Sequence, residues 1–167
     1  MSDELEELRE RNERLTLLHD ISNVIHATLD SQEALHLILR EAVRVMRASS
    51  GSVALVNPTT GLLEIQSSQG LPAAAQATQL RVGQGITGWV ARAGRAARVP
   101  DVRADPRYVM LRPEVRSELA VPLAVAGETR GVLNVDSERP DAFSAADQEL
   151  LEALAVQAAK VIHTTWL

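Results

Sequence analysis

The glycines between residues 83 and 94 constrain the fold of this chain more than any other feature. The residue types predict a strand over 79–82, a glycine turn, a helix of two turns over 87–93 and a helix stop at Gly94. Gly83, Gly85 and Gly88 also match the GxGxxG pattern of dinucleotide sites, and Asp101 follows where a ribose-binding acid would stand. A dinucleotide-binding unit, however, needs a crossover helix that runs the length of a parallel strand. Two turns are too short for that, so we interpret the glycines as the entry to a short helix beside an antiparallel sheet.

Two predicted β-hairpins surround this segment. Residues 52–57 and 62–69 are joined by a Pro-Gly turn, and residues 118–125 and 130–137 are joined at Gly127. Shorter strands are predicted over 79–82 and 97–99, and helices over 3–27, 30–48 and from 144 to the end of the chain. This order predicts the α+β class with a central antiparallel sheet of five to six strands. Alternation places Leu119 and Val121 on one face of the second hairpin and Glu118 and Ala120 on the other, and it leaves open which face meets a pocket.

Composition limits the chemistry that is open to the chain. Its 167 residues have the size of one domain. The sequence contains no cysteine, which excludes disulfides, thiolate metal sites and cysteine nucleophiles. The four histidines lack metal-ligand spacing, so we expect no metal and no cofactor.

Charge and hydropathy bear on partners and location. A net charge of −5 argues against general nucleic-acid binding. No apolar run reaches the ~20 residues of a membrane helix, and the N-terminus does not resemble a signal peptide, so we expect a cytoplasmic protein without membrane contact. The segment from Arg81 to Arg116 contains eight arginines and only three acidic residues. These arginines either hold a small anion or form a solvated surface.

The first helical pattern predicts a coiled-coil dimerisation helix over residues 1–20. Residues at heptad spacing form a stripe between charged faces, and Asn12 would set the register of a parallel dimer. The alternative is an amphipathic helix packed on its own domain, but its charged first turns would have little to pack on in a monomer. The dimer-interface candidates, including two from the last helix, are Leu5, Leu8, Asn12, Leu15, Leu154 and Val161.

Five blocks of the sequence resemble those of GAF domains. They are residues 83–91 (GQGITGWVA), 101–108 (DVRADPRY), 117–123 (SELAVPL), 131–137 (GVLNVDS) and 143–151 (FSAADQELL). The blocks stand in the family order and the resemblance covers essentially residues 15–165, so we assign residues 21–167 to a GAF domain. The resemblance implies terminal helices on one face of the sheet and the short helix and long loop over a pocket on the other. It also implies a dimeric sensory module of bacterial signalling, so we expect a homodimer that acts with an output domain or partner protein.

The candidate ligand-binding residues come from three features. These are the amides at the start of the short helix, the arginine-rich loop, and a resemblance to the free methionine-(R)-sulfoxide reductase branch, which places substrate-contacting carboxylates where Glu118 and Asp136 stand. Structural alternatives are Trp89 as a core lid residue, Asp136 as a turn cap and Glu118 as an ion-pair partner of a neighbouring arginine. The full set is Thr87, Gly88, Trp89, Asp101, Asp105, Arg107, Tyr108, Ser117, Glu118 and Asp136.

Two departures from the family narrow the expected function. Val135 and Gln148 replace a Lys and a Glu of the cyclic-nucleotide-binding signature, which argues against such a ligand. The reductase branch uses cysteine chemistry, and this chain has no cysteine. We therefore expect a protein that is not an enzyme: a sensory GAF module that dimerises and binds a small polar or anionic ligand. The alternatives are a purely structural dimerisation module and a reductase-like enzyme.

Overall fold

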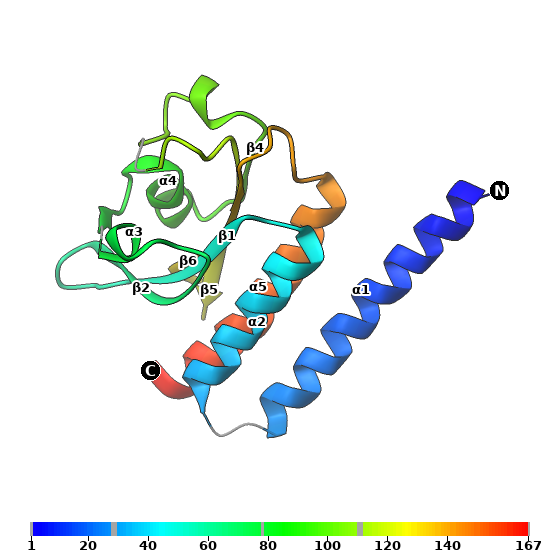
Figure 1. Cartoon of the computed structure of the whole chain (residues 1–167). Coiled ribbons are helices and arrows are strands. Elements are labelled where there is room, and N and C mark those ends of the chain that lie inside the picture. Colours follow the sequence, from blue (N-terminus) through cyan, green and yellow to red (C-terminus); the bar gives the residue numbers. More distant parts are fainter. Residues whose placement is uncertain (1, 28–29, 78, 110–111, 167) are drawn as a thin grey trace.

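The computed structural model describes residues 2–27, 30–77, 79–109 and 112–166 and has the α+β architecture expected from the sequence (Figure 1). Its centre is a six-stranded antiparallel sheet with the order β3-β2-β1-β6-β5-β4. The strands are β1 (Ser50–Val56), β2 (Leu62–Gln69), β3 (Leu80–Arg81), β4 (Ala97–Val99), β5 (Ser117–Val125) and β6 (Glu128–Ser137). The helices are α1 (Ser2–Ala27), α2 (Ser31–Met46), α3 (Ala73–Ala77), α4 (Gly85–Ala93) and α5 (Ala145–Trp166), with a single 3-10 turn, η1, over Val102–Ala104.

The two faces of the sheet are covered differently. Helices α2 and α5 lie against one face, whereas α3, α4 and the loop after β4 lie on the other (Figure 1). The helical face holds the larger core, in which Leu119 and Val121 of β5 pack with α2 and α5. The opposite core is smaller because the sheet presents small side chains there, Ala54 and Ala120. Tertiary packing thus turns Glu118 and Ala120 toward the α4 side, and the small residues leave space there for a pocket.

Side-chain caps define where two long helices begin. The Asp30 carboxylate accepts hydrogen bonds from the amides of Gln32 and Glu33 at the start of α2. At the start of α5, the Ser144 amide donates to Asp147, and the Asp147 amide donates back to the Ser144 hydroxyl at 3.1 Å. This reciprocal capping box satisfies amides that the first helical turn leaves free.

The glycines of residues 83–94 build the short helix that the sequence predicts. Helix α4 has nine residues and ends at Gly94, which adopts a left-handed φ of 65°. Gly88 allows a close approach, because a Cβ there would lie 2.5 Å from the Arg81 carbonyl oxygen. The Gly88 amide donates to the Gln84 carbonyl inside the helix. It is therefore occupied and does not point outward to a ligand.

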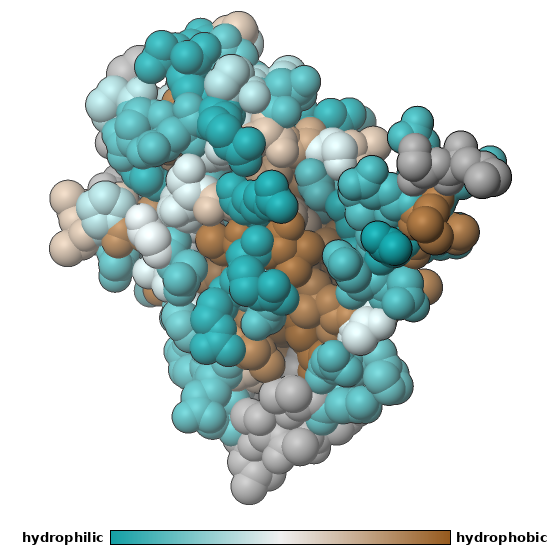
Figure 2. Space-filling view, turned by 45° about the vertical axis from the view of Figure 1, so that its right-hand side comes forward, coloured by the Kyte–Doolittle hydropathy of each residue, from teal (hydrophilic) through white to brown (hydrophobic). Residues whose placement is uncertain are grey.

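Helix α1 runs alongside α2 and α5 and diverges from them toward the N-terminus (Figure 1). Ile21 is buried among α2 and α5 residues, whereas Leu5, Leu8 and Leu15 are 52%, 63% and 60% exposed. Figure 2 shows hydrophobic surface at the tip of α1 and in the furrow between α1 and the body of the molecule. The predicted boundary between residues 20 and 21 falls inside this continuous helix, at the point where burial begins.

Two dimer-interface candidates lie elsewhere than expected. Leu154 and Val161 on α5 are 0% and 5% exposed within the single chain, because they face the sheet as part of its own core. They are therefore not available to a second chain. In the part of the chain that the structure describes, no helix is both long and apolar enough to cross a membrane.

Candidate functional site

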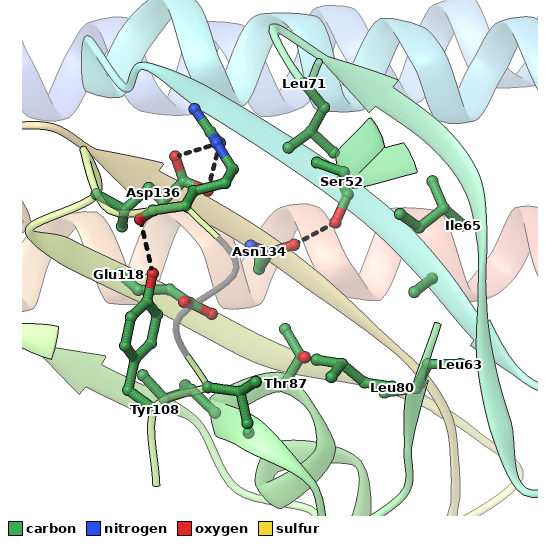
Figure 3. A pocket seen from close by; sticks show the side chains of 17 residues that line it. Ser52, Leu63, Ile65, Leu71, Leu80, Thr87, Tyr108, Glu118, Asn134 and Asp136 are labelled. Carbon is green, nitrogen blue, oxygen red and sulfur yellow. Dashed lines mark hydrogen bonds and ion pairs between the residues drawn. The ribbon is translucent and has the colours of Figure 1, made fainter. Parts of the chain in front are cut away.

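A pocket lies between the sheet and α4, with a cavity volume of about 120 Å³ (Figure 3). Apolar side chains from β1, β2, α3 and α4 form most of its wall, among them Ala54, Leu63 and Ile86. Polar groups converge from β5 and β6 and from Tyr108 and Arg112 of the loop before β5. A small, mainly apolar cavity with a few convergent polar groups is typical of ligand sites.

Two acidic residues face this pocket from adjacent strands. Glu118 on β5 and Asp136 on β6 are paired directly across the antiparallel ladder, and each is 7% exposed. Asn134, two residues before Asp136, therefore points to the same face and accepts a hydrogen bond from the Ser52 hydroxyl (Figure 3). Strand alternation thus supplies a row of polar groups on the floor of the pocket.

The Glu118 carboxyl is the most perturbed group in the site. Within the part of the chain that the structure describes, it has no hydrogen-bond or ion-pair partner. Burial raises its pKa to about 8, and the negative charges of Asp136 and Asp105 act in the same direction, against a smaller opposing effect of Arg107. At neutral pH this side chain is therefore mostly a neutral acid, and it becomes a carboxylate as the pH rises through about 8.

Asp136 is buried as deeply but has partners. It accepts a short hydrogen bond from the Ser50 hydroxyl and forms an ion pair with Arg112, whose Nη1 lies 3.4 Å from Oδ1. Burial still raises the pKa of Asp136 above its usual value, while Ser50 and Arg112 lower it. The two carboxyls thus differ, because the charge of Asp136 is compensated by Arg112 and that of Glu118 is not compensated by a paired cation among the described residues.

The loop between η1 and β5 supplies the remaining polar wall. Arg112 donates from Nη1 to the Ser50 hydroxyl at 2.6 Å and from Nε to Glu114 at 3.0 Å. The Tyr108 hydroxyl donates to the Arg112 carbonyl oxygen at 3.2 Å, so both the guanidinium and the backbone carbonyl of Arg112 form hydrogen bonds. Burial raises the pKa of Tyr108, and the hydroxyl therefore remains protonated at neutral pH.

Four of the ten predicted site residues line the pocket: Thr87, Tyr108, Glu118 and Asp136. Three others form a cluster next to it. Arg107 holds the Asp105 carboxylate through Nε at 3.0 Å and Nη2 at 2.7 Å, and its guanidinium lies 4.5 Å from the centre of the Trp89 ring. This cluster anchors the loop on α4.

The other three candidates have structural contacts. Asp101 caps η1 by accepting from the Arg103 amide. Ser117 points to the helical side of the sheet, where its hydroxyl donates to the Arg139 carbonyl oxygen at 2.6 Å. Gly88 serves the close approach of α4 to Arg81.

The set of candidates missed three residues that contribute polar groups. Ser52 and Asn134 could have been found from strand alternation, because both share a face with Asp136 once the β1–β6 pairing is known. Arg112 lies in a segment without periodicity. No pattern along the chain distinguishes it from the neighbouring arginines, so its place in the pocket follows from the path of the loop.

The structure has a six-stranded antiparallel sheet, with helices on one face and a pocket under a short helix on the other. Comparison of the sequence with protein families agrees with this fold. The profile of the GAF domain family matches residues 28–163. The chain belongs to the GAF domain family. The family expected from the five sequence blocks is thereby confirmed.

A regulatory protein is among the relatives of this GAF domain. The Nif-specific regulatory protein of Azospirillum lipoferum is 30% identical over 156 residues, which cover 86% of this chain and 25% of that protein. The chain therefore spans about a quarter of the length of this relative.

Two solved structures align over most of the chain. The free methionine-R-sulfoxide reductase of Neisseria meningitidis in complex with its substrate is 28% identical, with a TM-score of 0.81 over 89% of this chain and 87% of that chain. The GAF domain of a phosphoenolpyruvate-protein phosphotransferase from Acinetobacter is 21% identical, with a TM-score of 0.83 over 92% of this chain and 95% of that chain. The second likeness shows the fold alone.

The expectation that the chain is not an enzyme is wrong. It was based on the missing cysteine, but the Neisseria reductase is an enzyme and shares both sequence and fold with this chain. Membership of the family therefore gives no ground for excluding catalysis.

Proposed function

We propose that this GAF domain is a regulatory module that binds a small polar ligand in the pocket between the sheet and α4. The observation that carries the proposal is the Glu118 carboxyl, which is buried, faces the cavity and lacks a partner among the described residues. A buried polar group without a partner costs free energy. A ligand that supplies a hydrogen-bond donor or a positive charge would recover that cost.

Pocket size and charge limit the class of ligand. Ligand pockets commonly have volumes of about 300–1,000 Å³, so a cavity of about 120 Å³ favours a molecule smaller than a nucleotide. Arg112 on the cavity wall is already paired with Asp136, and Glu118 gains a negative charge as the pH rises, so the described floor of the pocket offers an anion no unpaired positive charge. Of the eight arginines between Arg81 and Arg116, Arg112 lines the cavity, whereas Arg107 is engaged by Asp105 and Trp89 outside it. A polar ligand with a donor group is therefore better supported than an anion.

The regulatory role rests on the kind of protein in which a similar domain occurs. The Azospirillum relative is a regulatory protein of which the matched part forms about a quarter. A ligand in this domain would act on an output domain or a partner protein through different affinity for two arrangements of the helices.

Dimerisation through α1 is part of the proposal. Leu5, Leu8 and Leu15 are exposed at heptad spacing, and Asn12 stands between them. An apolar stripe on an isolated helix is stabilised when a second copy of the same helix buries it. Light scattering at micromolar concentration measures the molar mass, and the proposal requires twice the mass of one chain.

A thermal-shift panel tests ligand binding. The compounds are free amino acids including methionine R-sulfoxide, small amines, small acids and nucleotides. Wild-type protein and the variants Glu118→Gln and Glu128→Gln are compared, the latter being a matched change of an exposed glutamate at the start of β6. We expect a compound with a donor group to stabilise the wild type and Glu128→Gln, with an affinity at least about tenfold weaker for Glu118→Gln, the effect of about one charged hydrogen bond. The absence of any stabilising compound, or equal affinity in all three proteins, overturns the proposal.

A further inference from the structure

We propose that Arg112 is a tethered occupant of a cation subsite in this pocket, and that a ligand with an ammonium or guanidinium group exchanges with it and thereby releases the loop. The inference rests on the proposed function in that the ligand enters the same pocket. The inference goes further because it says how ligand binding would change the loop: the ligand would displace Arg112, a loop residue that already fills part of the site.

The subsite consists of the Asp136 carboxylate and the Ser50 hydroxyl. Arg112 reaches both with one nitrogen, Nη1, at 2.6 Å from Ser50 and 3.4–3.5 Å from the two carboxylate oxygens. Its side chain is only 13% exposed, so the guanidinium is inside the pocket wall and is not a surface charge. The Arg112 guanidinium therefore occupies the position in which a cationic group of a ligand would interact most favourably with the Asp136 carboxylate.

The ion pair of Arg112 with Asp136 is loose. Charge-assisted hydrogen bonds between a guanidinium and a carboxylate are typically about 2.7–2.9 Å long and frequently involve two nitrogens. Arg107 and Asp105 in the same loop show that geometry, with two nitrogens at 3.0 and 2.7 Å. Arg112 instead approaches Asp136 with one nitrogen and at a longer distance. Exchange for a ligand that fits the carboxylate better would therefore cost little.

Charge balance favours one cation at a time. Glu118 and Asp136 are directly paired across β5 and β6, and Glu118 is mostly a neutral acid at neutral pH, so removal of Arg112 leaves the buried Asp136 carboxylate without compensation. Asp136 must then take up a proton or another cation. The ammonium or guanidinium group of a ligand restores the balance, and Arg112 is then free to turn toward solvent and its exposed partner Glu114.

Release of Arg112 would affect a defined part of the loop. The Arg112 carbonyl oxygen accepts the hydrogen bond of Tyr108, so displacement of the residue also disturbs this second wall group. The Asp105–Arg107–Trp89 cluster lies outside the cavity and keeps its contacts. Residues 112–116 would therefore leave the pocket wall, while residue 107 remains anchored on α4.

Chemical rescue tests the subsite with methylguanidine as the probe. Truncation in Arg112→Ala empties the subsite, and millimolar methylguanidine should raise the midpoint of thermal unfolding of this variant by several degrees. The wild type, whose subsite is filled, should show no such rise. Arg92→Ala, which removes an exposed arginine of α4 outside the pocket, is the matched control for general effects of the compound.

Two further measurements keep the test decisive. Adding Asp136→Asn to Arg112→Ala should abolish the rescue, and hydrogen exchange at residues 112–116 should be faster in Arg112→Ala than in the wild type. Should Arg112→Ala not fold, Arg112→Gln takes its place, since it retains part of the stem. Equal midpoint shifts in the Arg112 and Arg92 variants, or rescue that persists with Asp136→Asn, overturns the inference. The proposed function fails separately, when no compound of the panel binds the wild type.

Discussion

At the scale of the residue, protonation of Glu118 controls the polarity of the pocket. The carboxyl lies beside Asp136 on the neighbouring strand, and Asp105 and Arg107 act on it from the loop. Arg112 is engaged with Asp136, so it does not pair with Glu118. The site therefore contains one compensated carboxylate and one carboxyl whose charge depends on pH near neutrality.

This arrangement predicts that the stability of the protein depends on pH through Glu118. Because its pKa is about 8 when folded and 4.5 in its unperturbed state, the folded chain binds more protons in this interval. Stability is thus highest below about pH 4.5 for this group and falls as pH rises through about 8. Glu118→Gln removes this dependence, so its stability relative to the wild type should rise between pH 5 and 9 by on the order of a few kcal/mol.

Urea unfolding of both proteins across this pH range measures the difference. Asp136, whose pKa burial also raises, contributes a slope of the same sign in both proteins, so most of the difference between them comes from Glu118. The exposed control Glu128→Gln should follow the wild type. Parallel curves for the wild type and Glu118→Gln would show that Glu118 is not titrating in this interval.

At the scale of the element, α4 depends on a glycine for its position. A methyl group at Gly88 would meet the Arg81 carbonyl oxygen at 2.5 Å and the Gly83 amide nitrogen at 3.1 Å, and backbone atoms cannot move aside as a flexible side chain can. Gly88→Ala should therefore destabilise the fold by about 1–3 kcal/mol, the range of overpacking.

A second glycine provides the comparison for this prediction. At Gly127 the added methyl group meets nothing within 4 Å, and only the left-handed φ of 80° is unfavourable. Gly127→Ala should therefore cost about 1 kcal/mol from backbone strain alone. Because α4 carries Thr87 and Ile86 into the pocket wall, Gly88→Ala should also weaken ligand binding, and Gly127→Ala should not.

Helix α5 carries a contact that joins two elements. Asp147 takes part in the capping box with Ser144 and also forms an ion pair with Arg14 of α1 at 2.9 Å. Asp147→Ala should cost about 1–2 kcal/mol, mostly through the lost cap, and should speed hydrogen exchange in α1. Ser144→Ala should produce the loss of stability without the change in α1, which would separate the two roles; equal exchange in both variants would contradict this division.

At the scale of the whole molecule, the first half of α1 has little support from its own chain. Its buried contacts begin in its second half, near Leu17, Leu18 and Ile21. The first half presents apolar side chains to solvent beside the furrow seen in Figure 2. A second copy that packs along this half would bury them.

The dimer proposal predicts that charges on the stripe abolish association without unfolding the domain. Leu8→Asp combined with Leu15→Asp introduces like charges into the predicted seam, so light scattering should give the mass of one chain. Circular dichroism should show a folded domain, because both side chains are exposed. A double variant of the face opposite the stripe, Glu6→Lys with Glu10→Lys, should remain dimeric. A dimeric leucine variant would place the interface elsewhere.

The sequence by itself determined the elements and their order. Periodicity, caps and glycines are properties of neighbouring residues, so the hairpins, the two-turn helix and the caps at Asp30 and Ser144 could be predicted from local chemistry. Strand alternation likewise placed Glu118 opposite Leu119. The motif blocks added the family and the position of the two carboxyls.

Only the tertiary structure decided which groups meet. Packing of α2 and α5 selected the Leu119 face of the sheet and so turned Glu118 toward the pocket, while Leu154 and Val161 became core. The path of an aperiodic loop brought Arg112 to Ser50, which lies 62 residues away in sequence. Such contacts depend on the balance of burial and charge over the whole molecule, and no local pattern encodes that balance.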